Sequence, residues 1–144
     1  MKNYRKFRLH PVKRAKEYYQ VCIFNNRLSM RLFAKQILND KNHMHSEAST
    51  HSFRAYKMVD GQKVISPMIG AMLFYKGGFG HGVVAHEMAH AVNYLFLKQK
   101  IDFSIGKKHD DNWKECDETY ATILGYMVNQ FWKKLGDNVG KERY

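Results

Sequence analysis

An α+β fold, with a small and mostly antiparallel sheet packed on two C-terminal helices, is predicted by three features of this 144-residue sequence. Two segments rich in β-branched and aromatic residues, 18–24 and 69–75, have the composition of strands. Between them, Asp60-Gly61 separates two strand-like segments and is typical of a two-residue hairpin turn. Two long segments of helical character close the chain. With 44% hydrophobic and 14% aromatic residues, residues 1–144 are expected to form one domain with its own core.

The elements of the first half follow from local patterns. Residues 18–24 (YYQVCIF) are bounded by Asn25-Asn26, which predicts a strand ending there. Residues 27–38 are predicted to be helical, because apolar side chains recur at close to helical spacing: Leu28, Leu32, Phe33, Ile37 and Leu38. Residues 41–50 are polar and predict a loop. The hairpin arms are then expected at 52–59 and 62–65, with a further strand at 69–75.

Four glycines follow the last predicted strand, in the segment KGGFGHG. This segment lacks both the GxxxxGK[ST] and the GxGxxG spacing of phosphate-binding loops, so we interpret it as a flexible strand-to-helix turn. The first closing helix is predicted from about His81 to Lys98. The second is predicted from Asp110 or Asp111 to Leu135, with acids in its first turn and lysines near its end, as the helix dipole favours.

The formal net charge of +11 is concentrated in the first part of the chain. The first 100 residues hold 17 Lys/Arg and 5 Asp/Glu, whereas the last 44 hold 7 and 8. Residues 1–16 form a basic N-terminal arm with seven basic side chains and no acid. Such an arm either attracts nucleic acid or an acidic partner, or is a solvated, partly frayed segment that keeps the protein soluble.

Cysteine content and hydropathy favour the cytoplasm. Cys22 and Cys116 form no CxxC pair and are expected to be free thiols, as is usual in a reducing compartment. The longest apolar run, residues 64–75, is interrupted by Ser66, Pro67 and Gly70 and is too short to cross a bilayer. We expect no signal peptide and no membrane association.

The first closing helix contains the motif HEMAH. Residues 83–97 are otherwise apolar almost all round, which predicts a helix buried on nearly every side. The exceptions are His86, Glu87, His90 and Asn93, and burying such groups costs several kcal/mol unless a partner satisfies them. Histidines at i and i+4 can bind one divalent ion through one nitrogen each, and Glu87 can reach the water on that ion. The alternative is a pair of hydrogen-bonded core histidines beside a structural glutamate.

A catalytic zinc needs a third protein ligand. The longer HExxHxxGxxH pattern fails, because Phe96 stands where that pattern has its third histidine. The second closing helix has an apolar stripe that extends back to an acid, in the order Leu135, Phe131, Val128, Leu124, Ala121 and Glu118, with Gly125 one turn after Ala121. We therefore predict Glu118 as the third ligand, on a face packed against the first helix. Asp117 and Glu115 are the alternatives.

The HEMAH motif, followed 28 residues later by the Glu-x-x-Ala unit ETYA, resembles the gluzincin branch of the zincin-like metallopeptidases over about residues 70–132. The small size is similar to that of peptidases from bacterial, phage and mobile-element genomes, including repressor-cleaving and SprT-type enzymes. The resemblance implies one zinc ion held by His86, His90 and Glu118, with Glu87 as general base. It also implies that residues 69–75 form the sheet edge along which an extended peptide substrate lies. Thr122 stands where several gluzincins have an Asp that bonds a ligand histidine.

The group that stabilises the oxyanion has four candidates: His109, His81, Tyr120 and Tyr126. We favour His109, which lies in a polar segment just before the second helix. His43, His45 and His51 are interpreted as surface histidines rather than as a second metal site. An alternative function is a catalytically silent zincin-fold module that binds metal and meets DNA or an acidic partner without cleaving a peptide bond.

Overall fold

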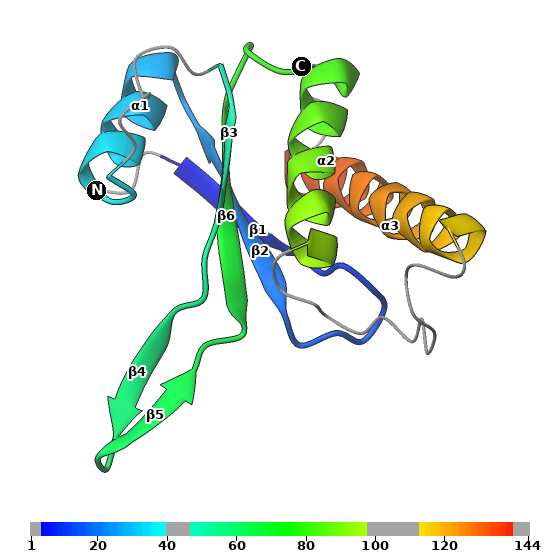
Figure 1. Ribbon diagram of the computed structural model, residues 1–144. Helices are drawn as coiled ribbons and strands as arrows, with labels where there is room; N and C mark the ends of the chain where they lie inside the picture. The colour runs from blue at the N-terminus through cyan, green and yellow to red at the C-terminus, as the bar shows by residue number, and fades with distance from the viewer. Residues whose placement is uncertain (1–3, 40–46, 98–112, 140–144) are drawn as a thin grey trace.

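The computed structural model describes the backbone of residues 4–39, 47–97 and 113–139, and the side chains of 4–39, 47–96 and 118–136 (Figure 1). The fold is α+β, as predicted. Its elements in chain order are β1 (Tyr4–Leu9), β2 (Tyr18–Phe24), α1 (Arg27–Gln36), β3 (Ser49–Ser52), β4 (Tyr56–Val59), β5 (Gln62–Ile65), β6 (Met68–Tyr75), α2 (His81–Leu97) and α3 (Trp113–Val139).

The main sheet has four strands in the order β1-β2-β6-β3. β2 and β6 are parallel, whereas β1 pairs with β2, and β3 with β6, in the antiparallel sense. The expectation that residues 69–75 form the sheet edge is therefore wrong, because β6 lies between β2 and β3. Seven of the eight residues of β6 are buried, which is typical of a strand covered on both faces. The edge beside α2 is β3, in a segment whose sequence predicts a loop.

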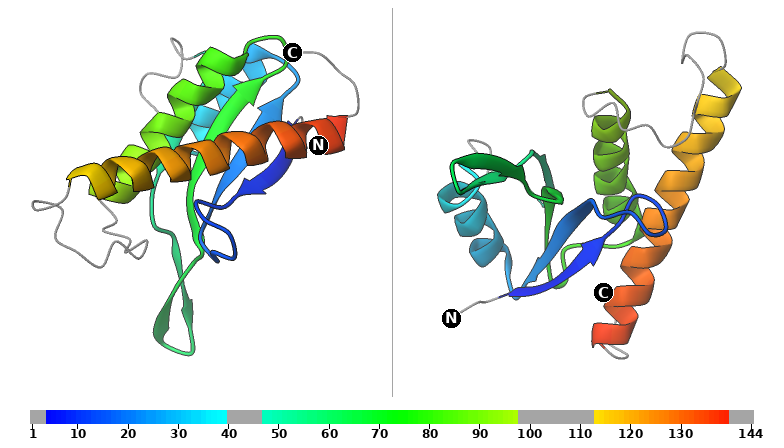
Figure 2. Two further views of the ribbon diagram at one scale, coloured as in Figure 1. Left: turned by 90° about the vertical axis from the view of Figure 1, so that its right-hand side faces the viewer. Right: turned by 90° about the horizontal axis from the view of Figure 1, so that it is seen from below.

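Helices cover both faces of the sheet, with α2 and α3 on one side and α1 on the other (Figures 1 and 2). Side chains alternate along β2, so Tyr19, Val21 and Ile23 pack toward α2 and α3, while Cys22 and Phe24 pack toward α1. The larger core therefore lies beneath α2, the helix that carries the HEMAH motif.

The buried stripe of α3 differs from the predicted one. Ile123, Met127, Phe131 and Leu135 are at most 2% exposed, whereas Ala121 and Gly125 are exposed. Phe131 is the centre of this contact, with ring centroids 5.6 Å from Phe7, 5.1 Å from Phe74 and 5.8 Å from Phe79. Glu118 is exposed and does not continue the buried stripe, so the reasoning that placed it on the inward face is wrong.

The basic N-terminal arm is partly built into the sheet. Residues 4–9 form the edge strand β1, and Phe7 and Leu9 pack into the core beneath α3. Gln130 of α3 accepts a hydrogen bond from the backbone N–H of His10 at 3.0 Å and donates to the His10 carbonyl at 2.6 Å. These bonds satisfy backbone groups beside the sheet edge, where an unpaired strand is otherwise exposed.

The first helix and the hairpin carry exposed apolar side chains. In α1, Met30 and Ala34 are buried, whereas Leu28 and Leu32 of the predicted apolar set are 64% and 42% exposed. The hairpin of β4 and β5 turns at Asp60-Gly61, where φ is 51° and 77°, as a type I′ turn requires. Figure 1 shows this hairpin projecting away from the main sheet. None of the helices within the described residues is long and apolar enough to cross a membrane.

Candidate metal centre

The helix α2 presents the HEMAH residues at the boundary between core and solvent. Its buried side is formed by Val84, Met88, Ala91, Val92 and Leu95, each 0% exposed. On the opposite side His86, His90 and Asn93 are exposed, while Glu87 is only 5% exposed. The prediction of a helix buried on nearly every side is therefore wrong. The two imidazoles are open to solvent, and Glu87 carries the cost of burial.

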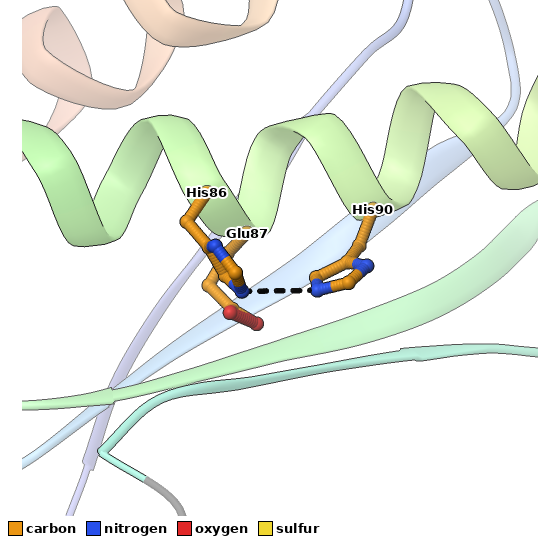
Figure 3. Close-up of side chains that lie close together, drawn as sticks. All are labelled: His86, Glu87 and His90. Atoms are coloured by element: carbon orange, nitrogen blue, oxygen red, sulfur yellow. Dashed lines mark hydrogen bonds between the residues drawn. The ribbon is translucent and has the colours of Figure 1, made fainter.

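The two histidines converge on one point (Figure 3). Their Nε2 atoms lie 3.1 Å apart, close enough for one to donate a hydrogen bond to the other. Two imidazole nitrogens bound to one tetrahedral zinc, each at about 2.0–2.1 Å, would lie about 3.4 Å apart, so the observed separation is close to that of a shared ion. Among the described side chains, the group of three potential ligands is His86, Glu87 and His90, whose ligand atoms all lie within 4.8 Å of one another.

Glu87 is held from the edge strand β3. The Thr50 hydroxyl donates a hydrogen bond to Glu87 Oε1 at 3.0 Å and lies 3.2 Å from the Glu87 carbonyl oxygen, which also accepts. Oε2 accepts no hydrogen bond from any side chain in the described part of the chain. The second carboxylate oxygen is therefore available on the side of the histidines. Sequence reasoning missed Thr50, since it lies 37 residues from Glu87 in a segment that reads as a loop.

Tyr19 anchors α2 from below. Its hydroxyl shares a 2.6 Å hydrogen bond with Ser52 Oγ of β3 and donates to the Ala91 carbonyl at 3.5 Å. Burial raises the pKa of Tyr19 to about 12, an effect that the bond to Ser52 partly opposes. Gly70 makes room for this ring, because a Cβ there would lie 2.4 Å from Tyr19 Cε1 and from the His51 carbonyl oxygen. β2, β3 and α2 are thereby fixed relative to one another directly beneath His90.

The predicted third ligand lies on the helix that packs beside α2. Tyr120 of α3 donates to the Ala89 carbonyl at 3.4 Å, and its ring centroid lies 5.8 Å from that of Phe96. Glu118 is two residues earlier on α3 and is exposed, and it is not part of the group formed by His86, Glu87 and His90. The side chains of Asp117 and Glu115 lie outside the described residues, as does the whole of His109.

The remaining candidates have other surroundings. The ring of His81 lies 4.5 Å from that of Trp132, and Tyr120 bonds to the backbone of α2. Tyr126 is half-buried on α3. His51 bonds Ser49 Oγ at 3.0 Å, while His43 and His45 lie outside the described residues. His81 and Tyr120 thus have partners that account for their positions.

Comparison with known proteins found no match for this chain among protein-family models, curated proteins or solved structures.

Proposed function

We propose that the chain is a zinc-dependent metallopeptidase of the gluzincin type. The observation that carries this proposal is the convergence of His86 Nε2 and His90 Nε2 at 3.1 Å beside a buried carboxylate. An i, i+4 histidine pair with an intervening glutamate is the arrangement used by HExxH metalloproteases. The proposed ligands are His86, His90 and Glu118, for one zinc ion.

The residues present fit this ion in number and chemistry. Two imidazoles and one carboxylate are a known ligand set for catalytic zinc, with a fourth position open to water. The exposure of both histidines supports the proposal, since a peptide must reach the site from solvent. When bound, zinc lowers the pKa of a water molecule toward neutrality and polarises the carbonyl of the scissile bond.

Glu87 is the proposed general base. Thr50 holds Oε1, so Oε2 is the oxygen that accepts the proton of the attacking water. The carboxylate then passes this proton to the nitrogen of the leaving amine. His109 remains the proposed donor to the developing oxyanion. Thr50 acts through Glu87 and is a positioning residue.

The substrate is proposed to be a peptide in extended conformation, aligned with β3. This strand is the edge of the four-stranded sheet, so one side of its backbone can pair with an added strand. Thr50 lies within it and contacts Glu87, which brings the edge next to the proposed base. The cytoplasm is the proposed compartment, a choice that the buried free thiol of Cys22 supports.

The test combines zinc content with cleavage of a diverse peptide library, read by mass spectrometry. The purified wild type is expected to hold about one zinc per chain and to cleave a subset of peptides. Glu87→Gln should keep the zinc and lose cleavage, whereas His86→Ala and His90→Ala should lose both. His81→Ala is the matched control and should keep both, because its ring packs against Trp132.

Two outcomes would contradict the proposal in different ways. Zinc bound by the two histidines without cleavage of any library peptide would favour a catalytically silent zincin-fold module. If zinc content were unchanged in both His86→Ala and His90→Ala, the metal site itself would be refuted.

A further inference from the structure

Exposed basic side chains collect on β1 and on the loop that joins it to β2. Lys6 and Arg8 are exposed and two residues apart on β1, so they point to the same face of the sheet. The loop adds Lys13, Arg14 and Lys16, which are also exposed. These five residues are termed the basic surface.

The loop is anchored rather than loosely attached. Pro11 is buried, Val12 packs against the main core, and the Ala15 N–H donates to the Val12 carbonyl at 3.2 Å. Arg14 has a φ of 68°, a left-handed conformation that glycine and asparagine adopt more readily. An arginine is thus held at a position where its backbone conformation is unfavourable, which indicates that its side chain has a use there.

Elements distant in the sequence meet at Arg8. Its guanidinium lies 4.3 Å from the centroid of the Tyr18 ring of β2, and its carbonyl accepts a hydrogen bond from Lys134 of α3. Burial lowers the pKa of Lys134, and the neighbouring Arg8 guanidinium lowers it further. Lys133, also exposed, extends the positive charge along α3. Figure 2 shows the β1–β2 loop beside this part of α3.

Little negative charge balances this region. Among the described residues of 4–20 and 118–136, the acids are Glu17 and Glu118, and Glu17 pairs with Arg54 at 3.9 Å. None of the five residues of the basic surface forms an ion pair with an acid that the structure describes.

The kind of partner follows from what the basic surface lacks. Protein interfaces are usually centred on exposed aromatic or aliphatic anchors, and membrane-inserting surfaces need apolar side chains. The large hydrophobic side chains that are exposed in the described structure lie elsewhere, on or next to α1 and on the hairpin. A purely cationic surface instead suits a regular array of phosphates.

We propose that the basic surface binds the phosphate backbone of nucleic acid, without reading its sequence. This role is independent of the proposed peptidase activity, because no residue of the basic surface belongs to the metal centre. A peptidase so equipped would act on proteins that share its nucleic acid.

The test measures binding of the full chain to a fluorescent DNA duplex of about 25 base pairs by anisotropy, at several salt concentrations. Five phosphate contacts predict that log Kd rises with log salt concentration with a slope of about 4.5. The triple variant Lys6→Gln, Lys13→Gln, Lys16→Gln should lower this slope by about 2.7 and weaken binding at least about tenfold at about 100 mM salt.

A matched control is the triple variant Lys35→Gln, Lys57→Gln, Lys63→Gln. It removes the same three charges from the net charge of +11, at lysines that are equally exposed but lie on α1 and the hairpin. We expect it to bind within about twofold of wild type. Both variants should unfold at the wild-type temperature, since the six lysines are at the surface.

Three results would overturn the proposal. The first is no binding of the wild type to the duplex at about 50 mM salt. The second is equal weakening by the two triple variants, which would mean that net charge rather than this surface is responsible. The third is tighter binding to polyglutamate or to phosphatidylserine vesicles than to DNA.

Discussion

Thr50→Val is the substitution that most directly tests how the proposed base is held. Valine keeps the shape and the strand preference of threonine but replaces the hydroxyl with a methyl group. It removes the 3.0 Å hydrogen bond to Glu87 Oε1 and the 3.2 Å contact with the Glu87 carbonyl. Glu87 then remains buried at 5% exposure with a carboxylate that no described side chain orients.

The magnitude follows from the charge on the acceptor. A hydrogen bond to an ionised group contributes about 1.5–3 kcal/mol, and about 1.4 kcal/mol corresponds to a tenfold change in rate. If most of that free energy is needed to keep the carboxylate aligned in the transition state, kcat falls about 10- to 100-fold in Thr50→Val. KM and zinc content are expected to stay near wild type, because Thr50 is not a proposed ligand.

The assay compares kcat, KM and zinc content of wild type, Thr50→Val and Thr50→Ser on a peptide that the wild type cleaves. Thr50→Ser keeps the hydroxyl and is expected to remain within about threefold of wild-type kcat. Equal losses in the valine and serine variants would show that the hydroxyl is not the cause. A Thr50→Val enzyme with wild-type kcat would refute the positioning role while leaving the peptidase proposal intact.

Three further predictions concern the third ligand, pH and the core. Among Glu118→Gln, Asp117→Asn and Glu115→Gln, only the first is expected to weaken zinc binding, by about tenfold or more in chelator competition; weakening in another variant would move the assignment to that residue. The raised pKa of Tyr19 stabilises the fold below pH 10, and this contribution is lost as pH rises toward about 12. Between about pH 9 and about pH 11, wild type should therefore lose about 1.4 kcal/mol of unfolding free energy that Tyr19→Phe does not lose, as measured by urea titration. Phe131→Ala removes a 0% exposed ring that contacts three other phenylalanines, and should lower the unfolding free energy by about 3–5 kcal/mol; a loss below about 1 kcal/mol would show that this core is loosely packed.

Local patterns in the sequence were sufficient for most of the secondary structure. The hairpin turn at Asp60-Gly61 is confirmed, since glycine tolerates the positive φ that this turn imposes. The HEMAH helix begins at His81, as predicted. Such features depend on interactions within a few residues, which the order of amino acids specifies directly.

Burial was harder to predict. The apolar residues of α3 are compatible with more than one inward face, because both Ala121 and Ile123 can be buried in a helix of this composition. The aromatic partners of Phe131 come from β1, β6 and the turn before α2, and these contacts decided that Ile123 faces the core. In the same way, β1 appeared as a basic arm until Phe7 found its place beneath α3.

By itself the sequence determined that two histidines and a glutamate share one helix, because i, i+4 spacing places both imidazoles on the same side of any α-helix. Only the tertiary structure decided that the histidines are exposed, that Glu87 is buried and that Thr50 holds its carboxylate. The physical reason is that this hydrogen bond joins residues 37 positions apart. It forms only when β3 pairs with β6 and α2 packs across the sheet.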